Sequence, residues 1–132
     1  MPLPVNHPIS ERTISAATNS IATTPLACAV AAPFPGRIRT VAGVAHGAFT
    51  GDCSVAVAIV RAPVAGVAPG SGTALTGSPL TLTAANSAAG TSASLDPTGD
   101  ASVFEGDLVV FTPSGATGTT IGGTFSATFT RL

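Results

Sequence analysis

Short β-branched runs interrupted by glycine and proline are the feature that most restricts how this chain can fold. The chain has 15 Gly and 11 Pro among its 132 residues, and from Pro25 onwards they separate short runs rich in Val, Ile, Thr and Phe. Glycine and proline mark turns, whereas β-branched and aromatic residues favour strands. No stretch suits a helix of useful length, so the pattern predicts an all-β fold.

About eight strands are expected. Many short strands joined by Gly- and Pro-containing turns favour an antiparallel sandwich or a closed barrel. The expected strands and strand fragments are 26–32, 37–45, 52–62, 74–76, 80–84, 91–95, 102–104, 108–112 and 123–131.

Alternation along three of these strands predicts which side chains face the core. In 52–62 both faces are apolar, which indicates burial on both sides or one core face and one interface face. In 123–131 phenylalanine alternates with hydroxyl residues, so this strand should pair centrally rather than lie at an open edge. In 37–45 strict alternation places Ile38, Ala42 and Val44 on one face and Arg37, Arg39 and Val41 on the other.

Residues 1–24 differ from the rest of the chain. Isolated isoleucines stand among Pro, Ser, Thr and Asn, and neither a strand period nor a helical stripe persists. We expect an extended N-terminal arm over residues 1–24, followed by the β-domain over residues 25–132. The arm is either a frayed terminus or a segment that becomes ordered on a neighbouring subunit or partner. Its candidate contact residues are Ile9, Arg12, Ile14 and Ile21.

Composition argues against several classes of function. Charged residues make up 8% of the chain, the net charge is −1, and all five basic residues are arginines. Nucleic-acid binding depends on clustered cations, so no nucleic-acid partner is expected. Because the chain has no Trp or Tyr, a site that binds sugars by aromatic stacking is less expected. Residues 1–8 show neither the basic nor the apolar region of a signal peptide, so export by the Sec route is not expected. No apolar run reaches the ~18 residues that span a bilayer, so no membrane partner is expected.

Catalysis and metal binding are not expected either. A Ser-His-Asp triad could be formed from Ser54, His46 and Asp52. Hydroxyl residues are so common in this chain that such a combination arises by chance. The Gly-x-Ser-x-Gly motif of a nucleophile elbow is not present. The acidic group Asp96, Asp100, Glu105 and Asp107 lacks the spacing of a calcium loop. Turn chemistry is the better interpretation of these acids, with a shared ion as the alternative. No cofactor is expected.

Two further residue pairs leave alternatives open. Cys28 and Cys53 fall in expected strands and are either buried reduced thiols, a disulfide or, least favoured, metal ligands. Arg37 and Arg39 are either solvated strand charges or a contact strip at an interface, where arginine makes paired hydrogen bonds that survive desolvation.

Five stretches, taken in order, give the chain a familiar outline. They are Gly36-Arg37-Ile38-Arg39-Thr40-Val41, 52–60, Leu80-Thr81-Leu82 with Ser87-Ala88-Ala89-Gly90, 103–111, and 125–131. In this order they resemble the jelly-roll capsid decoration, cement and head-fibre-base proteins of tailed bacteriophages. The resemblance covers residues 25–132. It implies an eight-stranded antiparallel jelly-roll sandwich, homotrimers on an icosahedral shell and an arm that reaches the capsid or a neighbour.

The resulting hypothesis is a virion structural protein that is made in the host cytoplasm, binds the major capsid protein from outside and stabilises the shell. It is not an enzyme. The alternative is a receptor- or glycan-binding jelly-roll module of a phage fibre or tail. The plain loops and few aromatic residues favour the first.

Overall fold

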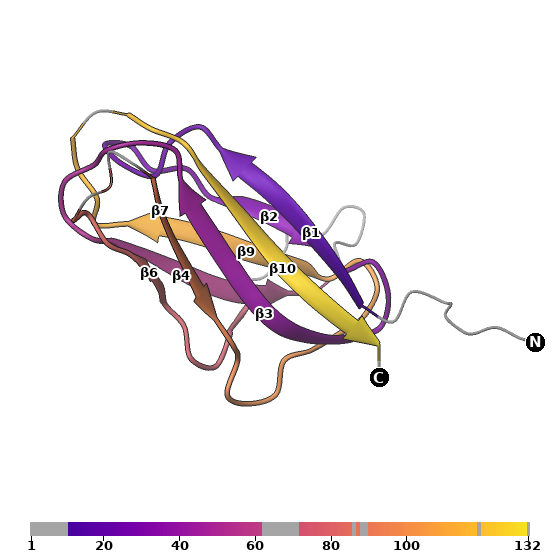
Figure 1. The fold of residues 1–132 in the computed structure, drawn as a ribbon. Helices are drawn as coiled ribbons and strands as arrows, with labels where there is room; N and C mark the ends of the chain where they lie inside the picture. The colour runs from indigo at the N-terminus through magenta and orange to yellow at the C-terminus, as the bar shows by residue number, and fades with distance from the viewer. Residues whose placement is uncertain (1–10, 62–71, 86, 88–89, 119, 132) are drawn as a thin grey trace, which may run out of the picture.

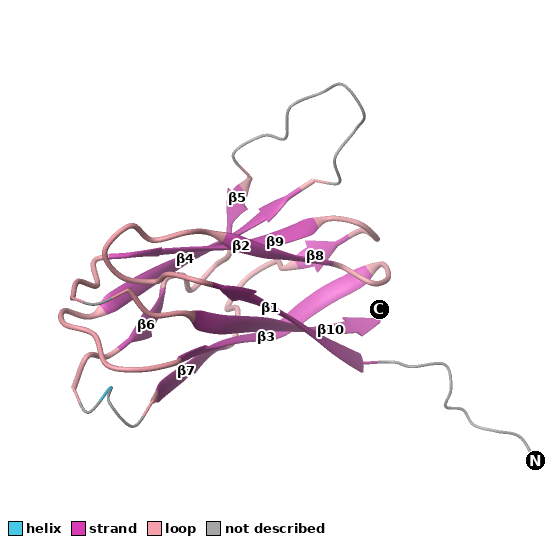
Figure 2. Ribbon diagram, turned by 90° about the horizontal axis from the view of Figure 1, so that it is seen from above, coloured by secondary structure: helices cyan, strands magenta, loops and turns pink. Residues whose placement is uncertain are grey.

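The computed structural model describes residues 11–61, 72–85, 87, 90–118 and 120–131, and it consists of two antiparallel sheets packed face to face (Figure 1). The view turned by 90° shows the two layers of strands (Figure 2). No α-helix occurs in the described part of the chain. The expected all-β fold with two antiparallel layers is therefore confirmed.

Each sheet contains five of the ten described strands. The first sheet has the order β1-β10-β3-β7, and β8 also pairs with β3. The second has the order β2-β9-β4-β5, and β6 also pairs with β4. The strands are β1 (Glu11–Thr18), β2 (Cys28–Ala31), β3 (Gly36–Ala45), β4 (Cys53–Val60), β5 (Thr73–Ala74), β6 (Leu80–Leu82), β7 (Thr91–Leu95), β8 (Ser102–Val103), β9 (Leu108–Ser114) and β10 (Gly123–Arg131).

The strand pairs are nested along the chain. The first strand pairs with the last, β2 pairs with β9, and β3 pairs with β7 and β8, while β4 pairs with β5 and β6 at the centre of the nest. As expected, the last strand is not an edge, because β10 lies between β1 and β3. The two sheets also meet at their sides, where β1 contacts β2 and β6 contacts β7.

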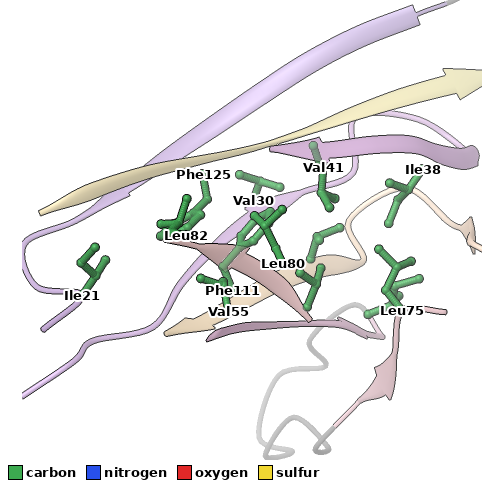
Figure 3. Packing of buried hydrophobic residues seen from close by; sticks show 14 of the residues in the cluster. Ile21, Val30, Ile38, Val41, Val55, Leu75, Leu80, Leu82, Phe111 and Phe125 are labelled. Atoms are coloured by element: carbon green, nitrogen blue, oxygen red, sulfur yellow. The ribbon is translucent and has the colours of Figure 1, made fainter. Parts of the chain in front are cut away.

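The core lies between the sheets and combines aliphatic side chains with stacked phenylalanines (Figure 3). Phe111 of β9 and Phe125 of β10 come from opposite sheets, and their ring centroids are 5.3 Å apart with planes inclined by 15°. Both rings are fully buried. This stack therefore joins the middle of one sheet to the middle of the other.

Gly43 explains how a phenylalanine fits at the centre of the first sheet. It lies opposite Phe125 in the β3–β10 register. A Cβ atom at residue 43 would stand 2.6 Å from Cδ1 of Phe125 and 3.2 Å from Cδ2 of Leu80. Glycine in a strand often marks such a close approach. The missing side chain at residue 43 is thus the space that the Phe125 ring occupies.

A β-bulge in β3 overturns the strict alternation expected for 37–45. Thr128 lies opposite Thr40 and Phe129 opposite Ile38, so Arg39 has no counterpart in β10. An extra residue in one strand shifts the faces of all residues beyond it. Ile38 and Val41 are consequently both buried, whereas Val44 is 44% exposed.

The predicted boundary at residue 24 also needs correction. From Glu11 onwards the expected arm is part of the sandwich, since β1 pairs with β10 along its whole length. Ile21 is fully buried in the core, and its N–H donates to the carbonyl of Ile121 at 2.9 Å. The isolated isoleucines of this stretch do not form a strand pattern that sequence analysis can recognise, although the stretch contains a strand. The partner of that strand comes from the far end of the chain. Residues 1–10, with Ile9, lie outside the described residues.

We predict that Gly43→Ala destabilises the fold by about 1–3 kcal/mol, because the added methyl overpacks the Phe125 ring. Chemical denaturation would measure the free energy of unfolding. Gly47→Ala is the matched control, since its Cβ would meet only Cγ2 of Ile121 at 3.7 Å, an ordinary contact. Equal stabilities of the two variants would contradict this account of the core.

Candidate functional site

The outer face of the second sheet is unusually apolar for a surface. Strand alternation turns Val57 and Ile59 of β4 towards the core and Ala56 and Ala58 outwards. The register then aligns outward residues of four strands in neighbouring rows. We call these the apolar face: Ala29 and Ala31 of β2, Ala56, Ala58 and Val60 of β4, Ala74 of β5, and Leu108 and Val110 of β9.

The apolar face suits contact with another surface rather than chemistry. Its members carry no polar side-chain atom, and alanine side chains leave a sheet face flat. Ala29, Ala31, Ala56 and Ala74 are exposed, Ala58, Leu108 and Val110 are half-buried, and Val60 is buried. Contiguous exposed apolar surface is a typical mark of an interaction site. The two-faced pattern expected of 52–62 is thus found in β4, with one face in the core.

One end of the apolar face carries a charged corner that sequence analysis had not found. Phe104 to Asp107 form a tight turn, in which Asp107 N–H donates to the Phe104 carbonyl at 3.1 Å and Gly106 has φ 88°. Asp107 Oδ2 accepts from the Phe104 N–H at 2.9 Å and from Arg61 at 2.5 Å. The Asp107 side chain is 2% exposed and that of Arg61 is 65% exposed.

Arg61 also lies over an exposed aromatic ring. Its guanidinium carbon is 5.5 Å from the centroid of Phe104, which is 68% exposed. Aromatic and arginine side chains are enriched in the energetic centres of protein interfaces. The corner therefore offers an anchored cation and an apolar ring beside the end of β4 and the start of β9. The turn residues Glu105-Gly106-Asp107 were the available signal in the sequence, but the partner Arg61 is distant in the chain.

Asp100 is a second acidic residue whose side chain accepts hydrogen bonds from a nearby residue of the chain, as expected for an acid in a turn. Its Oδ1 accepts from the Ser102 hydroxyl at 2.6 Å and from the Ser102 N–H at 3.0 Å. These two bonds, first the one from the hydroxyl, lower the pKa of Asp100. Desolvation opposes this effect, and the charge of Arg61 adds to it. Asp107 holds the neighbouring turn in a similar way. Among the described residues, no group of three or more His, Cys, Asp and Glu is placed to hold a metal ion.

The outer face of the first sheet is instead lined with hydroxyls. Thr13 of β1 and Thr128 of β10 lie opposite each other, and their Oγ1 atoms are 2.8 Å apart. The same rows continue along both strands. We call these residues the hydroxyl face: Thr13 and Ser15 of β1, Thr124, Ser126, Thr128 and Thr130 of β10, Thr40 of β3, and Ser92 and Ser94 of β7.

An ion pair spans the central strand of the hydroxyl face. Arg39 Nε lies 2.6 Å from Glu11 Oε2, and its Nη2 donates to Oε1 at 3.3 Å, although β10 lies between β1 and β3. Thr130 of β10 lies opposite Glu11, and its hydroxyl oxygen is buried without a hydrogen-bond partner in the described part of the chain. Both charged side chains are about half exposed, so the pair contributes only ~0–1 kcal/mol to stability.

The predicted contact residues do not form one site. Arg12 is exposed at the start of β1, and Ile14 of β1 is half-buried against the core. Arg37 is exposed opposite Ser102 and Thr130. Arg37 and Arg39 flank the buried Ile38, and the structure gives Arg39 a definite role in the bridge to Glu11.

The other sequence candidates lie apart. Cys28 and Cys53 are free cysteines, and burial raises the pKa of both thiols, while a backbone hydrogen bond from Ser114 opposes this for Cys53. His46 Nε2 lies 2.8 Å from Thr124 Oγ1, and Asp52 Oδ1 accepts from the Ala84 N–H at 2.9 Å. Neither bond belongs to a Ser-His-Asp arrangement. In the described ranges no helix is long and apolar enough to cross a bilayer.

We predict that Asp107→Ala destabilises the fold by about 2–4 kcal/mol, since it removes the acceptor of a backbone N–H and of a charged group at a buried position. Arg61→Ala should cost less, about 0.5–1.5 kcal/mol, because the guanidinium is largely solvated. Thermal or chemical unfolding would compare the two. An equal or larger loss from Arg61→Ala would contradict the proposed hierarchy.

We also predict that Ser102→Ala raises the pKa of Asp100 towards its ordinary value, as measured by NMR titration of the carboxyl carbon. Because the folded-state pKa is lowered, Asp100 stabilises the fold above the ordinary aspartate pKa, and this contribution disappears as the pH falls through the lowered folded-state value. The acid side of the stability profile should therefore be flatter in Ser102→Ala. Ser94→Ala is a control that should leave the Asp100 titration unchanged.

Comparison of the chain with models of protein families, with curated proteins and with solved structures found no match in any of the three.

Proposed function

We propose that the protein is a virion structural protein that binds the outside of a phage capsid through the apolar face and stabilises the shell. The apolar face carries this proposal, because a row of outward Ala, Leu and Val residues is better covered than hydrated. A protein that binds only the assembled shell shifts the equilibrium towards assembly by mass action. No cofactor and no catalytic step is required.

The nested strand order supports a jelly-roll topology for the sandwich. The short strands β5 and β6 share one side of β4, and β7 and β8 share one side of β3. If each such pair is counted as one interrupted strand, the chain has eight strand positions, in which the first pairs with the eighth, the second with the seventh, and so on inwards. Eight strands in two antiparallel sheets are characteristic of jelly rolls.

The partner in this proposal is the major capsid protein, and the working form is a homo-oligomer, a trimer by the family resemblance. Several copies fixed on one lattice multiply weak individual contacts into durable attachment. A flat face of small side chains suits this role, since it buries area without requiring long side chains to be ordered. Localisation to the virion surface follows from the same proposal.

We expect Ala56→Arg to abolish attachment to capsids, with at least ~100-fold weaker binding, because a cation would be buried within the contact. Ala56 is exposed, so the variant should fold normally. Ser94→Arg is the matched control, since Ser94 is exposed on the hydroxyl face and receives the same side chain. Co-sedimentation with undecorated capsids measures the binding. Loss with Ser94→Arg and retention with Ala56→Arg would assign attachment to the wrong sheet.

One observation favours the alternative of a receptor- or glycan-binding module. Phe104 is a largely exposed aromatic ring beside a fixed arginine, which is a combination that can stack on a sugar or peptide. In the capsid proposal this ring borders the contact instead. Specific, saturable binding on a glycan array that Phe104→Ala removes, together with no binding to capsids, would replace the proposed function by this alternative.

A further inference from the structure

The apolar face is too uniform to fix the position of a partner by itself. Its outward residues on β2 and β4 include alanines that recur at every second position, namely Ala29, Ala31, Ala56 and Ala58. If a partner shifts by two residues along these strands, about 6.6 Å, one alanine takes the place of another. A partner that binds in one position therefore needs a further contact with larger side chains at the border of the face.

The charged corner, which is Arg61 with the turn from Phe104 to Asp107, places such side chains next to the apolar face. The row of Ala31, Leu108 and Val60 ends the face, and both parts of the corner adjoin this row in the chain. Phe104 is 68% exposed, whereas each of the other five phenylalanines is at most 6% exposed. The largest exposed apolar side chain of the described residues is therefore at the border of the face.

The corner is already formed before any partner binds. The buried Asp107 carboxylate accepts from the Phe104 N–H at 2.9 Å and from Arg61 at 2.5 Å. The end of β2 holds the same turn, since the Ala32 N–H donates to the Asp107 carbonyl at 2.8 Å and the Gly106 N–H donates to the Ala32 carbonyl at 3.0 Å. A preformed contact loses less conformational entropy on binding than a flexible one.

Arg61 has hydrogen-bonding capacity that a partner covering the corner must satisfy. A guanidinium group has five N–H donors. Among the described residues, Asp107 is the only hydrogen-bond acceptor that the structure gives this side chain. N–H groups that lose their water in a contact are costly when they stay unpaired. A surface that covers the corner therefore needs acceptor atoms close to the place where it meets the Phe104 ring.

The charges at the corner favour uncharged acceptors over carboxylates. The single cation, Arg61, is paired with Asp107, its charge also acts on Asp100, and Glu105 is exposed in the turn. Negative charge is thus in excess, and a further carboxylate from a partner would be repelled. A backbone carbonyl accepts the same hydrogen bonds without adding a net charge. The corner therefore matches a surface that offers carbonyl oxygens.

We propose that the surface bound by the apolar face receives the Phe104 ring in an apolar pocket, whose rim offers backbone carbonyl oxygens to the remaining N–H groups of Arg61. This inference rests on the proposed function and adds the contact that fixes the position of the partner. The apolar face supplies buried area, and the corner selects one position. Interfaces commonly divide these roles in this way, with aromatic and arginine side chains supplying most of the binding energy.

Substitutions at the corner of the full chain test this proposal by co-sedimentation with undecorated capsids. We expect Phe104→Ala and Arg61→Lys each to weaken attachment at least ~10-fold, since lysine keeps the charge but lacks the planar donor set of arginine. Attachment of the wild type should change less than ~3-fold between about 0.05 M and about 0.5 M salt, because uncharged acceptors are little affected by screening. Val44→Ala and Arg37→Lys are matched controls at exposed positions of the first sheet and should attach like the wild type.

The proposal is wrong if Phe104→Ala attaches as strongly as the wild type, or if Arg61→Lys does so while Arg61→Ala is weakened. Steep weakening with salt would also contradict it, because a carboxylate of the partner would then be the acceptor. Unchanged chemical denaturation of Phe104→Ala shows that its loss of attachment is not a loss of folding.

Ala56→Arg separates this inference from the proposed function. If Ala56→Arg abolishes attachment and the corner variants do not weaken it, the inference about the corner fails alone. If Ala56→Arg attaches like the wild type, the proposed function fails, and the inference fails with it.

Discussion

The contact between Phe111 and Phe125 is the interaction on which the arrangement of the two sheets depends. The two rings stack at 5.3 Å across the middle of the sandwich, and Gly43 leaves the space in which one of them lies. In a chain rich in alanine and glycine, few side chains are large enough to fill the distance of ~10 Å between packed sheets. Phe111 of β9 and Phe125 of β10, from the two outermost strand pairs of the nest, fill it. Both outer faces can then be built from small residues without loss of the core.

The two outer faces differ because the same alternation is filled with different residues. In β10 hydroxyl residues alternate with phenylalanine and alanine, so the outward side of the first sheet is polar and can be hydrated. In β4 and β9 the outward positions are largely Ala, Val and Leu, so the residue types on the outward side of the second sheet resemble those of a buried core. This asymmetry underlies the proposed attachment to a shell.

Local sequence predicted the elements well where neighbouring residues decide the structure. The predicted strands 91–95 and 123–131 agree with β7 and β10. The alternation of phenylalanine with hydroxyl residues in β10 also predicted that this strand lies between two others. The apolar outward side of β4 was also recognised from the sequence. Long-range pairing was less accessible. Arg61 and Asp107 meet only after folding. The local sequence of β1 does not predict a strand, because the strand that pairs with β1 is at the opposite end of the chain.

The sequence by itself determined an all-β chain with turns at glycine and proline, because turn and strand preferences act between residues that are close in the chain. Only the tertiary structure decided which strands pair, where alternation breaks at Arg39, and whether Glu11 to Ile21 belong to the sandwich or to an arm. These outcomes depend on contacts between residues that are far apart in sequence. A one-residue bulge changes the face of every residue beyond it. The position of the bulge is set by pairing with the opposite strand, so the local strand preference of the sequence does not predict it.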